Sequence, residues 1–122
     1  MRLNYTSTFL LLLSMLCGGT LSAQMLFETF VYGGVGQAQL DFATAVAVSP
    51  DGRHLYSASF DDHAISIFDR NTNTGKLSFF HSFRDGENGI YGLKGTHDLI
   101  VSPDGNHVYA AGLNGDAVVV FE

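Results

Sequence analysis

Side chains suited to acid–base chemistry and to anion binding lie in one stretch of this sequence. His97 is followed by Asp98; a histidine titrates near neutral pH, and a carboxylate can orient its ring. Upstream, Arg84 could clamp an anionic group and Glu87 could polarise a water molecule. We therefore take His97, Arg84 and Glu87 as candidate catalytic residues. A purely structural alternative stays open, because neighbouring strand residues point to opposite faces and glycine-rich loops often only connect strands.

Metal and cofactor chemistry have little support in the sequence. Residues 69–75 resemble the start of a calcium loop, but the glycine comes one place late and no glutamate occupies the twelfth position. A plain hairpin turn is the better interpretation. The sequence has no Cys/His cluster for zinc, no Gly-x-Ser-x-Gly and no phosphate loop. We expect neither a metal nor a cofactor.

The composition indicates a small domain rich in strands. The chain has 122 residues, with 14 Gly, 10 Phe, 5 Tyr and only 15% charged residues, which argues against disorder. Many glycines beside aromatic and β-branched residues favour strands joined by tight turns. The net charge is −6, from 12 acidic and 6 basic residues, and no basic stripe is visible. This balance disfavours nucleic acid and anionic membrane surfaces as partners.

The first 23 residues have the three parts of a secretory signal peptide. Arg2 precedes an apolar run, residues 9–17, and the small-residue end Leu21-Ser22-Ala23 follows. The run is too short for an ordinary transmembrane helix, although a short anchor or a buried helix remains as an alternative. Cleavage after Ala23 predicts a secreted or periplasmic protein. It also removes Cys17, the only cysteine, so disulfides cannot support the mature fold.

A shift of 53 residues aligns the sequence with itself without a gap. Fifteen of the 43 positions from 27 to 69 are then identical, including Ser49-Pro50-Asp51-Gly52 with Ser102-Pro103-Asp104-Gly105. Recurring residues such as His54 and His107 are expected to serve the repeated unit itself. Pro at the second and Gly at the fourth place of the shared tetrapeptide suit a type I turn.

Each unit contains short strand signals separated by turn residues, without helical periodicity. We predict an all-β fold of β-propeller blades, each of four antiparallel strands, with about two blades present. The domain 24–122 would hold a lone fourth strand at 26–31, a full blade at 43–83 and three strands of the next blade at 97–122. The runner-up is a small β-sandwich, which predicts cleaner alternation of apolar and polar residues than strand 117–121 has.

Two blades cannot close a ring, because closed propellers have about four to eight. Two stacked blades would expose two outer faces, together about 700–800 Å² even as flat projections. This area exceeds the apolar patch of a typical monomer, so we expect an isolated monomer to be marginal or prone to aggregate. The partners we expect are further blades, either missing from this chain or supplied by other copies.

The segment Val48–Tyr56 and its repeat Val101–Tyr109 resemble the blade signature of the lactonase-like β-propellers. This family includes bacterial 6-phosphogluconolactonase and proteins with the YVTN repeat. The resemblance covers residues 26–122 and is specific for the fold. It implies seven blades at full length. It also implies hydrolysis of sugar lactones in some members and a surface or periplasmic role in others. A histidine often precedes the innermost strand; His97 fits this position, whereas the first unit has Thr44.

Two functional hypotheses follow. The first is an exported module for binding or scaffolding that is a fragment of a longer propeller, which further 53-residue units would complete. The second is an enzyme, a lactone hydrolase in which His97, Arg84 and Glu87 line the site and Arg84 holds a sugar phosphate. The sequence identifies no ligand or substrate for either hypothesis.

Overall fold

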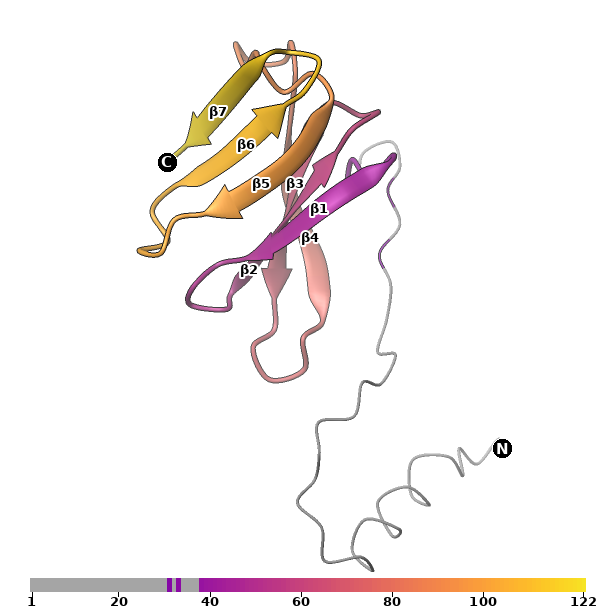
Figure 1. Ribbon diagram of the computed structural model, residues 1–122. Helices are drawn as coiled ribbons and strands as arrows, with labels where there is room; N and C mark the ends of the chain where they lie inside the picture. Colours follow the sequence, from indigo (N-terminus) through magenta and orange to yellow (C-terminus); the bar gives the residue numbers. More distant parts are fainter. Residues whose placement is uncertain (1–30, 32, 34–37) are drawn as a thin grey trace, which may run out of the picture.

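The computed structural model describes residues 31, 33 and 38–122, which form seven strands (Figure 1). The predicted signal segment 1–23 and, apart from Val31, the predicted strand 26–31 lie outside this range. No helix long and apolar enough to cross a membrane occurs among the residues just given. The strands are β1 (Ala43–Val48), β2 (His54–Ser59), β3 (Ala64–Arg70), β4 (Leu77–Arg84), β5 (Thr96–Val101), β6 (Val108–Gly112) and β7 (Ala117–Phe121).

The strands form two antiparallel sheets in simple up-and-down order. One sheet has the order β1-β2-β3-β4 and the other the order β5-β6-β7, with sequential strands always hydrogen-bonded neighbours. The fold predicted from the repeat is confirmed: the described chain is all-β, with one blade of four strands and three strands of the next. We call these the first sheet and the second sheet.

The Ser-Pro-Asp-Gly turns are built alike in both units. In the first unit, the Gly52 backbone N–H donates to the Ser49 carbonyl oxygen at 2.8 Å, and Gly52 has a φ of 74°. The Asp51 carboxylate accepts the Ser49 hydroxyl at 2.5 Å and the Arg53 backbone N–H at 3.0 Å. These hydrogen bonds hold the pKa of Asp51 below its ordinary value, with the serine hydroxyl contributing most. The aspartate therefore serves the turn, as the sequence predicts.

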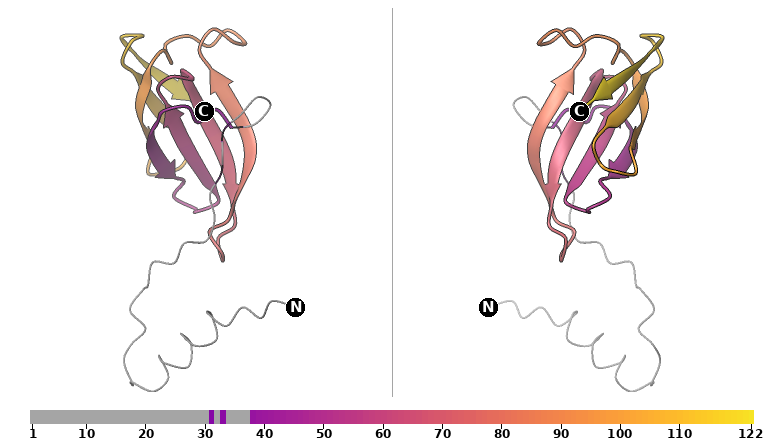
Figure 2. Two further views of the ribbon diagram at one scale, coloured as in Figure 1. Left: turned by 90° about the vertical axis from the view of Figure 1, so that its right-hand side faces the viewer. Right: turned by 90° about the vertical axis from the view of Figure 1, so that its left-hand side faces the viewer.

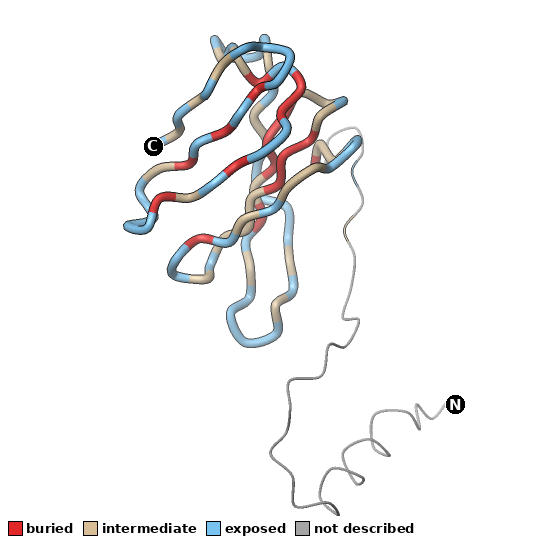
Figure 3. Tube along the Cα trace, viewed as in Figure 1, coloured by how far each residue is buried: buried red, intermediate tan, exposed pale blue. Residues whose placement is uncertain are grey.

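The core lies between the two sheets, which stack face to face (Figure 2). Small and branched side chains from both sheets meet there, together with one leucine of the connection between them: Ala58, Ile65, Leu93, Leu99 and Ala110. The buried parts of the chain accordingly follow the facing strands (Figure 3). Burial of these residues is the main contribution that holds the sheets together.

The outer face of the second sheet is open, and this excludes the sandwich alternative. A compact sandwich would bury Val118 and Val120, but their exposed fractions are 67% and 55%. The outer face of the first sheet is less apolar than expected, because it carries buried serines. The Ser66 hydroxyl there accepts the Gln39 backbone N–H at 2.8 Å. The segment before β1 therefore covers part of this face.

Candidate functional site

All three predicted catalytic residues lie at one end of the two sheets. Strand pairing places the starts of β1, β3, β5 and β7 and the ends of β2, β4 and β6 at this end. Four connections gather here: residues 38–42, 60–63, 85–95 and 113–116. We call it the linker end, after the linker 85–95 that joins the sheets.

His97 occupies a β-bulge near the start of β5. The pairing of β5 with β6 skips His97 between Thr96 and Asp98, and the side chain is exposed. The first sheet has the same irregularity at Thr44, between Ala43 and Ala45. A bulge re-aims one side chain out of the regular alternation of a strand. The repeat therefore presents a special position at this edge of each sheet, filled by threonine once and by histidine once.

The predicted His97–Asp98 pair does not form in this chain. The Asp98 carboxylate accepts the backbone N–H of the next residue, Leu99, at 2.8 Å. Within residues 38–122, no hydrogen bond or ion pair joins His97 to Asp98. Asp98 lies instead on the outer face of the second sheet, so nothing in the described chain orients the His97 ring by a carboxylate.

Arg84 and Glu87 lie at the opposite edge of the first sheet from β5. Arg84 ends β4, where its Nε donates to the Asp62 carbonyl oxygen at 3.0 Å, and Glu87 is exposed in the linker. β4 is three strands from β1, or about 14 Å at the usual strand spacing, whereas β5 packs beside β1. Arg84 and Glu87 thus lie together in one turn, where the Glu87 backbone N–H donates to the Arg84 carbonyl oxygen at 3.2 Å. His97 lies apart from them, on a strand of the second sheet. Their joint catalytic role stays a prediction.

Two residues that the sequence analysis did not single out organise the linker end. The Asp85 carboxylate accepts the backbone N–H groups of Gly92 and Leu93 at 2.8 and 2.9 Å, which clamps the linker into a closed loop. Nδ1 of His63 lies 3.0 Å from the Gly95 backbone nitrogen and ties the 60–63 turn to the linker. An aspartate that opens a glycine-rich loop is a signal for such backbone capping. The His63 contact has no comparable local signal.

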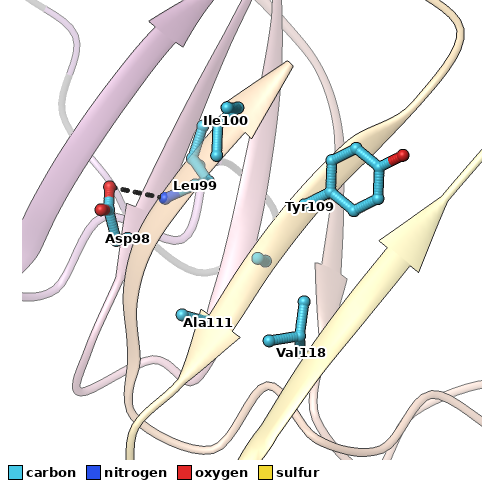
Figure 4. Close-up of a pocket in the computed structure, with 7 residues that line it drawn as sticks. Asp98, Leu99, Ile100, Tyr109, Ala111 and Val118 are labelled. Carbon is cyan, nitrogen blue, oxygen red and sulfur yellow. Dashed lines mark hydrogen bonds between the residues drawn. The ribbon is translucent and has the colours of Figure 1, made fainter. Parts of the chain in front are cut away.

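The outer face of the second sheet contains a shallow hollow of about 180 Å³ (Figure 4). Its lining is almost wholly apolar and comes from all three strands of that sheet: Asp98, Leu99, Ile100, Tyr109, Ala110, Ala111 and Val118. Asp98 is the only charged member of this set. A surface of this kind can bury another apolar surface, but it lacks the converging polar groups that a reaction needs.

No metal site is formed by the part of the chain that the structure describes. No three His, Cys, Asp or Glu side chains gather there closely enough to hold an ion. Where the sequence resembles a calcium loop, the Asn71 side-chain oxygen accepts the backbone N–H groups of Asn73 and Thr74 at 3.0 and 2.9 Å. This oxygen closes the turn between β3 and β4.

Stacked antiparallel sheets of up-and-down strands, joined by a linker that passes from the outer strand of one sheet to the first strand of the next, define β-propeller blades. Comparison with known proteins agrees. The chain superposes on a candidate 6-phosphogluconolactonase of Bacteroides fragilis with a TM-score of 0.57 and 21% identity, over 66% of this chain and 21% of that one. It superposes on the periplasmic gluconolactonase of Pseudomonas aeruginosa with a TM-score of 0.56 and 28% identity, over 65% and 20%.

In sequence, the chain is 28% identical over 82 residues to an uncharacterized protein of Staphylococcus aureus, which covers 63% of this chain and 24% of that protein. No protein-family model matches the chain. The fold of these blades is therefore similar to that of lactonase-like propellers, as the sequence resemblance predicts. The chain spans about a quarter or less of the length of these relatives.

Proposed function

We propose that this chain is an exported β-propeller module that acts by binding or as a scaffold, and that it works when further blades cover its open faces. The observation that carries the proposal is the exposed apolar outer face of the second sheet, where Val118, Ile100 and Val120 are all more than half exposed. A contiguous apolar surface on a small domain marks an interaction site. The signal-like segment 1–23 and the periplasmic relative support export.

The separation of the candidate catalytic residues also favours binding over catalysis by this chain. General acid–base chemistry needs its groups within hydrogen-bond reach of one substrate. His97 lies on β5, while Arg84 and Glu87 lie at the far edge of the first sheet. A substrate held by Arg84 would have to extend across the first sheet, about 14 Å at the usual strand spacing, to meet His97.

The test is a lactone-opening assay on the purified chain. Ring opening adds water across the ester bond and yields a carboxylate, a hydroxyl and one released proton, so a pH indicator follows the rate. With gluconolactone and its 6-phosphate as substrates, we expect the same rate as in buffer. A faster rate that His97→Ala removes would defeat the binding-only function.

Lactone hydrolysis by a completed propeller is the second candidate. The 28% identity to the periplasmic gluconolactonase and the exposed His97 in its bulge favour it. In that case the remaining site residues come from the other blades. The purified chain alone would be inactive, and activity would appear only after the missing blades are supplied.

A further inference from the structure

The exposed face of the second sheet repeats an interface that the molecule already buries. In the first sheet, Ala45, Ala47, Tyr56, Ala58 and Ile65 pack toward the second sheet. Fifty-three residues later, the equivalent positions all lie on the open face of the second sheet: Asp98, Ile100, Tyr109, Ala111 and Val118. Ile65 is 2% exposed and its equivalent Val118 is 67% exposed. The open face therefore has the composition of a blade interface that lacks its covering blade.

The complementary surface is also on this molecule. Leu99, which is 5% exposed, covers the first sheet from the second, and its equivalent 53 residues earlier is Val46. Val46 lies on the outer face of the first sheet and is 67% exposed. At Val46, the outer face of the first sheet in one copy thus offers the counterpart of Leu99 to the open face of another, while Gln39 covers Ser59 and Ser66 on the same outer face. Such a contact is head-to-tail, since each copy uses two different faces.

The edge of the second sheet gives an independent indication. In the first sheet, β3 pairs with β2 on one side and with β4 on the other. β7 is the equivalent of β3, and within residues 38–122 it pairs only with β6. The segment equivalent to the second part of β4 is Leu26–Val31, in which Phe27 and Phe30 match Phe80 and Phe83. This segment carries the sequence of a fourth strand.

The path of the chain decides which sheet that strand can join. The linker 85–95 crosses from β4 of the first sheet to β5 of the second sheet, which lies on one side of the first. In the sequence, residues 32–42 are the equivalent of this linker and have the same length, and the described residues 38–42 follow the same path. The Phe60 backbone N–H donates to the Phe42 carbonyl oxygen at 3.0 Å. The equivalent hydrogen bond of the second unit runs from the Leu113 backbone N–H to the Gly95 carbonyl oxygen, also at 3.0 Å. A fourth strand formed by Leu26–Val31 would, by the same step, belong to a sheet on the other side of the first sheet, away from the chain's own β7.

We propose that a second copy of this chain completes the second sheet, laying the outer face of its first sheet on the open face and adding its own Leu26–Val31 beside β7. The proposal rests on the proposed function. The pairing of β3 with β4 sets the register: Ala117 lies opposite the partner's Val31, as Ala64 lies opposite Arg84. Two sheet faces alone bury only about 800 Å² as flat projections, less than the ~1,200 Å² of a stable interface. The added strand supplies the remaining area and a row of backbone hydrogen bonds.

Mixed single-cysteine chains test this assembly. With Cys17→Ser in every chain, we mix an Ala117→Cys chain with a Val31→Cys chain and oxidise. Directly opposed strand residues are close enough for a disulfide. We expect disulfide-linked dimers only in the mixture, and a mass of at least two chains by light scattering of the unsubstituted protein. The matched control replaces Val31→Cys by Phe27→Cys, which lies about 13 Å further along the strand and should give no linkage.

Each other result decides against the assembly in a defined way. A monomer by light scattering, with no linkage in the mixture, overturns the proposal and leaves the blades to be supplied by a different chain. An oligomer without linkage overturns the strand exchange. Linkage in the Phe27→Cys control to the same extent overturns the register. None of these results concerns the lactone-opening rate of the purified chain, which separately tests whether this chain is itself a catalyst.

Discussion

Ile65 and Val118 occupy equivalent positions in the two units, but Ile65 is buried and Val118 is exposed. Substitutions at these two positions therefore measure how much stability a side chain gains when a neighbouring sheet covers it. Ile65→Ala removes three carbons from a fully buried side chain. At about 0.8 kcal/mol per buried methylene this is about 2.4 kcal/mol, and the cavity left behind raises it to about 3 kcal/mol. Val118→Ala removes two carbons that are only one third buried, so it should cost about 0.5 kcal/mol.

Urea denaturation followed by circular dichroism measures both losses, at a concentration low enough to keep the chain monomeric. If Ile65→Ala does not fold, Ile65→Val provides the comparison at about 1 kcal/mol. Raising the concentration should increase the cost of Val118→Ala toward about 1.6 kcal/mol, because a second copy then buries both carbons. Equal losses for the two alanine variants in the dilute chain would refute the assignment of buried and open faces.

Three further predictions concern the turns and the linker. Gly112→Ala should prevent folding or lower the free energy of unfolding by more than about 3 kcal/mol, because the added Cβ would lie 1.9 Å from the Gly92 backbone oxygen. Gly86→Ala is the control, since its Cβ would meet no atom within 4 Å. In urea melts it should lose only about 1 kcal/mol, the cost of its positive φ. The Ser102 hydroxyl is the main cause that lowers the pKa of Asp104, so the ionised carboxylate stabilises the fold fully above pH ~4 and loses this effect as the pH falls further. The melting temperature of Asp104→Asn should therefore depend less on pH below ~4 than that of the unsubstituted chain. Asp85→Ala should lose about 1–3 kcal/mol in urea melts, and Asp85→Asn, which keeps an acceptor oxygen, should lose less.

The repeat made the strands and their order predictable, because the signals are local. Ser49-Pro50-Asp51-Gly52 specifies its own turn through contacts within five residues, and it does so again 53 residues later. The full blade predicted at 43–83 corresponds to strands β1 to β4, which begin at Ala43 and end at Arg84. Short-range turn chemistry and apolar strand segments suffice for this level of structure.

The arrangement of the candidate site depends on contacts between distant residues, so the sequence predicted it less well. The bulge at His97 arises from the register of β5 against β6, which no local pattern encodes. The closeness of His63 to Gly95 joins residues 32 apart. The buried serines of the first sheet follow from the Gln39 backbone lying over them, again across 27 residues. The alternation of side chains between the two faces of a strand could not predict that the chain's own Gln39 would cover part of the outer face of the first sheet.

The repeat also yields a test that separates structure from catalysis at His97. Its equivalent, Thr44, lies with its hydroxyl 3.2 Å from the Thr96 carbonyl oxygen, so it donates from the first sheet to the second. An imidazole N–H at the same bulge can donate to the next blade in the same way. If this is the role of His97, His97→Thr should keep the oligomer mass in light scattering, while His97→Ala lowers it. If His97 acts on a lactone instead, both variants should keep the mass, and the propeller completed with the missing blades should lose its ring-opening rate in both, because threonine cannot replace the base.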